Sequence, residues 1–99
     1  MYRGTTPTLR FALPFDTNLV QKAYITFYQQ DRKQIEKQLS DCQIVNNQLV
    51  VTLTQEETLR FVTNVPLLMQ ARVVLSDGRV LASKVVRTVV HDILKEGVI

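Results

Sequence analysis

β-Branched residues dominate this sequence and limit the folds that are open to it. Valine occurs 14 times, threonine 10 times and isoleucine 5 times, whereas alanine occurs only 4 times. β-Branched side chains lose rotamer freedom in a helix but pack well on the pleated surface of a sheet. The composition therefore predicts an all-β protein. With 99 residues the chain is too short for two independent cores, so we expect a single domain over residues 1–99.

Short runs in which apolar and polar residues alternate predict where the strands lie. In the first run, Leu9, Phe11 and Leu13 alternate with Thr8 and Arg10, which gives one apolar and one polar face. Prolines precede and follow this run, and because proline cannot donate a ladder hydrogen bond, they limit the strand. The runs predict strands at 8–13, 19–29, 33–39, 42–45, 48–53, 67–76 and 79–90.

Turn and cap signals separate these runs. Asn46 and Asn47 are typical of a two-residue turn with positive φ, and the pair Asp77–Gly78 is the strongest hairpin signal in the sequence. Thr54 and Glu57 have the spacing of a capping box, which predicts one short helix that ends near residue 61.

Nothing in this pattern predicts a helix between successive strands, as parallel crossovers would require. We therefore expect an antiparallel, immunoglobulin-like β-sandwich of about seven strands with one short helix, and the alternative is a small β-barrel. Residues 1–7 and 91–99 flank the predicted strands and are expected to form an arm and a tail.

Charge and residue chemistry exclude several classes of function. Twelve Lys and Arg against nine Asp and Glu give a net charge of +3, and the cations are scattered, which favours a solvated surface over a nucleic-acid footprint. One cysteine and one histidine cannot supply a disulfide framework or a zinc site. His91 and Asp92 could be half of an acid–base pair, but side chains that are adjacent on a strand point to opposite faces. Cys42 is interpreted as a small buried hydrophobe. We expect no catalytic residue, no metal, no cofactor and no small-molecule substrate.

The tyrosines are the most informative aromatic residues. Tyr24 and Tyr28 share one face of their predicted strand, opposite Ile25 and Phe27. If Ile25 and Phe27 face the core, both tyrosines face outward, where exposed aromatic rings suit a protein contact. The alternative is that the sandwich buries both faces of this strand.

The two ends of the chain provide a second set of candidate contact residues. The tail combines polar residues with four large apolar ones, more than a solvated terminus normally carries. It is expected either to fold back over the sandwich or to dock on a neighbouring copy or partner. The arm could extend along a partner's edge strand. The candidate residues at the two ends are Tyr2, Arg3, Ile93, Leu94, Val98 and Ile99.

Five stretches of the chain carry a resemblance: residues 3–8 (RGTTPT), 9–16 (LRFALPFD), 23–27 (AYITF), 53–58 (LTQEET) and 96–99 (EGVI). With these stretches the chain resembles small uncharacterised proteins from phage and prophage structural gene clusters of Gram-positive bacteria. More distantly, the order of an extended entry strand, a hairpin and a final Asp-Gly hairpin is similar to the N-terminal β-sandwich domain of phage baseplate upper proteins. The resemblance implies a role in a virion or in tail assembly.

The sequence thus predicts a non-enzymatic phage or prophage structural or adaptor protein, of the tail or baseplate type, that acts through protein–protein contacts. Its expected partners are other virion or prophage structural proteins, or further copies of itself. The alternative is a nucleic-acid-binding β-domain that uses scattered Lys and Arg with exposed tyrosines. No signal peptide or membrane-spanning segment is recognised, so we expect the host bacterial cytoplasm during assembly, with association to the virion.

Overall fold

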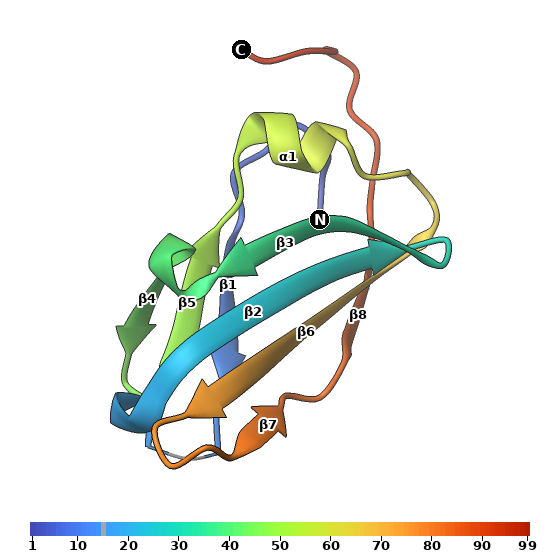
Figure 1. Ribbon diagram of the computed structural model, residues 1–99. Helices are drawn as coiled ribbons and strands as arrows, with labels where there is room; N and C mark the ends of the chain where they lie inside the picture. Colours follow the sequence, from blue (N-terminus) through green and yellow to red (C-terminus); the bar gives the residue numbers. More distant parts are fainter. Residues whose placement is uncertain (15) are drawn as a thin grey trace.

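Two antiparallel β-sheets form the framework of the computed structural model, which describes residues 1–14 and 16–99 (Figure 1). The strands are β1 (Thr8–Ala12), β2 (Val20–Gln29), β3 (Arg32–Gln38), β4 (Cys42–Val45), β5 (Gln48–Thr52), β6 (Pro66–Leu75), β7 (Val80–Ala82) and β8 (Val86–Val89). The helices are α1 (Gln55–Leu59) and two 3₁₀ turns, η1 (Thr17–Leu19) and η2 (Leu39–Asp41). One sheet has the order β1-β5-β4, and the other has the order β3-β2-β6-β7, with β8 also paired to β6.

The prediction of an all-β antiparallel sandwich is confirmed. Each sheet keeps two free edges, so the strands form a sandwich and not a closed barrel. The strand order differs in one respect from that of an immunoglobulin constant domain. In that domain the second strand belongs to the same sheet as the first and fifth strands. Here β2 lies between β3 and β6 in the other sheet.

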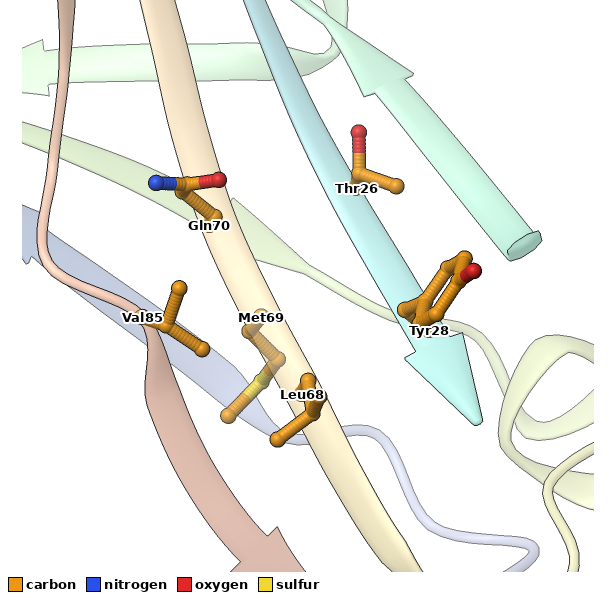
Figure 2. A pocket seen from close by; sticks show the side chains of 6 residues that line it. All are labelled: Thr26, Tyr28, Leu68, Met69, Gln70 and Val85. Atoms are coloured by element: carbon orange, nitrogen blue, oxygen red, sulfur yellow. The ribbon is translucent and has the colours of Figure 1, made fainter. Parts of the chain in front are cut away.

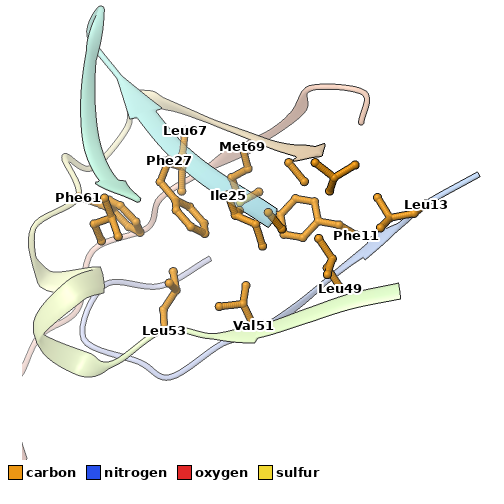
Figure 3. Packing of buried hydrophobic residues seen from close by; sticks show 14 of the residues in the cluster. Phe11, Leu13, Ile25, Phe27, Leu49, Val51, Leu53, Phe61, Leu67 and Met69 are labelled. Atoms are coloured by element: carbon orange, nitrogen blue, oxygen red, sulfur yellow. The ribbon is translucent and has the colours of Figure 1, made fainter. Parts of the chain in front are cut away.

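The core lies between the two sheets, and alternation along each strand supplies it (Figure 3). Ile25 and Phe27 of β2 are fully buried, and they face Leu49 and Val51 of β5 across the sandwich. Each such side chain contributes roughly 1.5–3 kcal/mol when it is buried. Other core residues are Phe11, Leu13, Ala23, Ile35, Leu53, Phe61, Leu67, Met69, Ala71, Val73, Leu75 and Val90.

The predicted turns have the backbone conformations that their residues favour. Asn46 and Asn47 both have positive φ, 48° and 61°, as a primed hairpin turn requires. Gly78 has a φ of +90° in the loop between β6 and β7, which confirms the Asp-Gly hairpin. Leu75 and Arg79 are hydrogen-bonded across this loop (2.8 Å), so the loop has three residues, and glycine occupies the position where an L side chain would be strained.

The predicted capping box is present at the start of α1. The backbone N–H of Glu57 donates to Thr54 Oγ1 at 3.1 Å, and the N–H of Thr54 donates to Glu57 Oε1 at 2.9 Å. The two side chains thus satisfy two of the amide groups that a helix N-terminus leaves without partners. The helix ends at Leu59, two residues before the predicted end.

The strand expected over residues 79–90 is interrupted, which corrects the prediction. β7 pairs with one half of β6 and β8 with the other half, and Ser83 lies at the break between them. Its Oγ accepts a hydrogen bond from the backbone N–H of Ala71 at 3.0 Å, and its own N–H donates to the Ala71 carbonyl at 2.8 Å. Because a side-chain oxygen replaces a backbone carbonyl there, the ladder is broken and the strand count rises from about seven to eight.

Candidate functional site

The outer face of the five-stranded sheet is an open surface on which side chains from β2, β6, β7 and β8 lie in rows. The pairing register places Tyr28 beside Leu68 and Leu68 beside Arg87. Four residues earlier in β2 and on the same face, Tyr24 lies beside Arg72. We define the tyrosine face by the residues Lys22, Tyr24, Thr26, Tyr28, Leu68, Gln70, Arg72, Val74, Val80, Val85 and Arg87.

The tyrosine face is shallowly hollowed beside each of its two tyrosines. A hollow of about 230 Å³ lies between Tyr28 and Val85, and Figure 2 shows the side chains of Thr26, Leu68 and Gln70 around it. A second hollow of about 360 Å³ lies between Tyr24 and Val80. Both hollows are open to solvent and much shallower than the concave sites that enclose small molecules. Their form suits a broad contact better than a bound metabolite.

The two tyrosines face outward, which resolves the alternative that the sequence left open. Tyr24 is 40% exposed and Tyr28 is 37% exposed, while their neighbours Ile25 and Phe27 are fully buried. The inward preference of Ile25 and Phe27 turns the tyrosines outward, because successive side chains alternate across a strand. Their role in a protein contact stays a prediction.

Three cations on the tyrosine face have no carboxylate partner within the part of the chain that the structure describes. Lys22, Arg72 and Arg87 form no ion pair there. Glu36 of β3, which borders the hollow beside Tyr24, lies 3.6 Å from the ammonium group of Lys33. The face therefore combines exposed aromatic rings with positive charge.

The sequence analysis did not identify Arg72 and Arg87 as part of a site. The alternation in β6, where Leu67, Met69 and Ala71 are buried, could have shown that Arg72 points outward. It could not have shown which residues lie beside Arg72. That depends on the pairing of β2 with β6, whose partners are about 48 positions apart in sequence, as Tyr24 and Arg72 are.

The two ends of the chain come together at the end of the sandwich that carries α1 (Figure 1). Tyr2 forms an isolated bridge with His91, and their rings lie 5.1 Å apart. The guanidinium of Arg3 contacts Asp92 at 2.8 Å and Glu96 at 3.0 Å. Hydrogen bonds to these two carboxylates raise the pKa of Arg3, and the bond to Glu96 has the larger effect.

The tail is tied to the body by polar contacts while most of its apolar side chains stay exposed. The side-chain amide of Gln55 both donates to the carbonyl of Ile99 (3.1 Å) and accepts from its N–H (2.9 Å). Ile93 is half-buried and packs close to Gly4. Leu94 is fully exposed, Ile99 is 84% exposed, and Val98 is 56% exposed. The tail thus folds back in part, without burying its apolar residues.

The side chains that could take part in catalysis, those of His91, Asp92 and Cys42, are engaged in structural contacts. The carboxylate of Asp92 accepts from the backbone N–H of Ile93 and from Arg3, which lower its pKa, and the His91 ring stacks on Tyr2. Burial raises the pKa of the half-buried Cys42 thiol, the opposite of what an activated nucleophile needs. Among residues 1–14 and 16–99, no three His, Cys, Asp or Glu side chains gather as metal ligands would. Over the same residues, no helix has the length and apolar character needed to span a bilayer.

No family model, curated protein or solved structure matches this chain.

Proposed function

We propose that this chain is a non-enzymatic structural or adaptor module that binds other proteins through the tyrosine face. The observation that supports this proposal is the arrangement of tyrosine and arginine on an open sheet face. Tyr24 is the register partner of Arg72, and Leu68 lies between Tyr28 and Arg87. Tyrosine and arginine are enriched among the residues that dominate protein–protein binding energies. Such rings present a large contact area with few rotatable bonds, so they lose little entropy on binding.

The proposed setting is the assembly of a phage or prophage particle of the tail or baseplate type. The support is the resemblance of residues 3–16, 23–27 and 53–58 to proteins of phage structural clusters. A β-sandwich by itself carries no function, because the same architecture serves many roles. The setting therefore depends on the partner, and the experiment must identify it.

Site-specific photo-crosslinking in the producing bacterium tests the proposal. A photoreactive phenylalanine analogue replaces Tyr28 in one variant and Tyr24 in a second, and a third carries it at the exposed strand residue Gln43 as a matched control. We expect one specific protein, a virion or prophage structural component, to be captured at positions 24 and 28 but not at position 43. The same capture at all three positions, or no capture at any, would contradict the tyrosine face as the contact.

The cations on the tyrosine face favour one second candidate, a nucleic-acid-binding β-domain. Lys22, Arg72 and Arg87 share a sheet face with two rings on which bases could stack, and Arg72 is the register partner of Tyr24. Binding of this kind weakens steeply as salt rises, because each neutralised phosphate releases counterions. Fluorescence anisotropy with a single-stranded oligonucleotide at low and physiological salt distinguishes the two functions. Binding that is salt-dependent and lost when Arg72 and Arg87 are replaced by glutamine would favour nucleic acid.

A further inference from the structure

The outer edge of β1 offers unpaired backbone groups beside an apolar groove. The N–H of Leu53 donates to the Pro7 carbonyl, and the N–H of Leu13 donates to the Asn47 carbonyl. In this register the odd-numbered residues of β1 are the ones that hydrogen-bond to β5. In an antiparallel pair the alternate residues point their N–H and C=O groups away from the partner. These residues are Thr8, Arg10 and Ala12. Within residues 1–14 and 16–99, no hydrogen bond reaches their outward backbone groups.

The groove beside this edge separates β1 from β7 and β8. It has a volume of about 550 Å³, and its apolar lining includes Phe11, Leu13 and Val86. Each side of the groove carries one cation: Arg10 lies on β1, and Lys84 lies on the segment between β7 and β8. Neither cation has a carboxylate partner among the described residues, and both are exposed.

The opposite wall of the groove offers no comparable edge. The strand there is broken at Ser83. Its N–H donates to the Ala71 carbonyl, and its hydroxyl accepts from the Ala71 N–H and donates to the Lys84 carbonyl. On the far side of the sandwich, β3 carries Lys33, Glu36 and Lys37, the kind of charged residues that protect an edge from pairing. β4, the other edge of the same sheet, exposes Ile44 and Val45. What distinguishes β1 is the groove beside it, where an added strand would also cover Phe11, Leu13 and Val86.

We propose that β1 binds an extended segment of a partner protein, with an acidic residue opposite Arg10 and an apolar residue on each side of it. An antiparallel strand added to β1 would place the residue opposite Arg10 on the outer, solvated face of the sheet, beside its guanidinium. The residues before and after it would point inward, toward Phe11 and Val86 in the groove. Pro7 and Pro14 limit the added strand to about five residues, or roughly 17 Å.

Charge argues against a second copy of this chain as the occupant. β1 pairs with itself over its full length only when Arg10 lies opposite Arg10 of the other copy. Like charges directly opposite each other destabilise a strand pair. A carboxylate at the same position would instead pair with Arg10, which has no carboxylate partner among the described residues.

The test uses two capped peptides, Ser-Thr-Val-Glu-Val-Thr-Ser and the same peptide with lysine in place of glutamate, titrated into the full chain labelled for amide NMR. We expect the glutamate peptide to shift the amide signals of Thr8, Arg10 and Ala12 and to slow their hydrogen exchange. The lysine peptide should bind about two- to fivefold more weakly, the range that an exposed cross-strand charge pair gives. In Arg10→Glu the preference should reverse, and in the matched variant Arg32→Glu on β3 it should not change.

Three outcomes would overturn the proposal: no binding, equal binding of both peptides, or shifts confined to other strands. Shifts at β1 that grow with protein concentration without peptide would also overturn it, because they would make a second copy the occupant. This proposal stands apart from the tyrosine face. A Tyr24→Ser/Tyr28→Ser variant should bind the glutamate peptide as the parent does, and failure of the peptide to bind leaves the crosslinking result unaffected.

Discussion

Gln29 is the buried polar residue on which the end of β2 depends. It is 1% exposed, its Oε1 accepts from the N–H of Val62 at 2.8 Å, and its Nε2 donates to the carbonyls of Val62 (2.8 Å) and Val65 (3.2 Å). One side chain thus satisfies three backbone groups of the loop that leads into β6. The sequence does not reveal this role, because a glutamine at the end of a strand usually faces solvent.

Replacing Gln29 by leucine should destabilise the protein by roughly 2–4 kcal/mol, because the loop's N–H and carbonyl groups would remain buried without partners. Urea unfolding of parent and variant measures the loss. Gln43→Met on β4 is the matched control, since Gln43 is exposed, and it should stay within about 0.5 kcal/mol of the parent. A Gln29→Leu variant as stable as the control would show that water satisfies the loop instead.

Gly78 tests the hairpin between β6 and β7. Its φ of +90° is unfavourable for L side chains, and an added Cβ would meet no atom within 4 Å. The cost of Gly78→Val is therefore backbone strain alone, about 1–3 kcal/mol. Gly78→Asn should lose clearly less, because asparagine tolerates positive φ. Equal midpoints of thermal unfolding for the two variants would mean that the loop relaxes to another conformation.

At the scale of elements, an ion pair joins the edge strand β3 to the helix α1. Lys37 Nζ lies 2.7 Å from Glu57 Oε2, and both side chains are mostly buried. Burial alone would raise the pKa of Glu57, but the hydrogen bonds from Lys37 and from the Thr54 N–H outweigh it and lower the pKa. The same carboxylate thus caps α1 and anchors it to the sheet.

The lowered pKa of Glu57 predicts how stability depends on pH. A carboxyl whose pKa is lower in the folded state contributes its full stability above the unfolded value, about 4.3, and loses it as the pH falls through the folded value. Glu57→Gln keeps the capping geometry but removes the charge. We measure the unfolding free energies of parent and variant near pH 7 and at a pH below the folded pKa. The two free energies should differ most near pH 7 and converge in acid. A difference that stays constant with pH would contradict the ion pair. Lys37→Met, which removes the partner charge, should likewise bring the pH dependence closer to that of Glu57→Gln.

The strands, turns and cap could be predicted because each depends on residues that are close in sequence. Thr54 and Glu57 are three positions apart, and Asn46 and Asn47 are adjacent, so their geometry is local. The break at Ser83 could not be predicted, because the surrounding β-branched residues favour a continuous strand and the interruption depends on a bond to Ala71. The same limit applies to the tyrosine face. Local alternation predicts that Tyr24 and Tyr28 point together, but only the sheet register brings Arg72 and Arg87 beside them.

The whole molecule is elongated, with extents of 47 × 27 × 16 Å. The tyrosine face lies on the outer side of the five-stranded sheet, and the groove lies between β1 and the β7–β8 segment. The two chain ends meet near α1 (Figure 1). Because different residues form these surfaces, one copy offers more than one region for contact. That property suits a module in an assembly, where each protomer must be held from several sides.

The tail provides the test at this largest scale. Residues 96–99 are held by Arg3 on Glu96 and by Gln55 on Ile99, and both contacts are exposed. Exposed polar contacts contribute little but measurably, so deleting residues 96–99 should lower the unfolding free energy by about 0.2–1 kcal/mol. The mass in solution, measured by light scattering, should not change if the tail only folds back on its own body.

A matched variant separates the polar ties of the tail from its apolar residues. Gln55→Ala removes both hydrogen bonds to Ile99 but leaves Leu94, Val98 and Ile99 in place. If the tail only folds back, Gln55→Ala should account for most of the stability lost on deletion, and both proteins should keep the parent's mass. If the parent is an oligomer and the deletion yields a folded monomer, the exposed apolar residues of the tail dock on a neighbouring copy. Burying them in that interface would stabilise the oligomer relative to leaving them in water. A deletion that changes neither stability nor mass would contradict both roles of the tail.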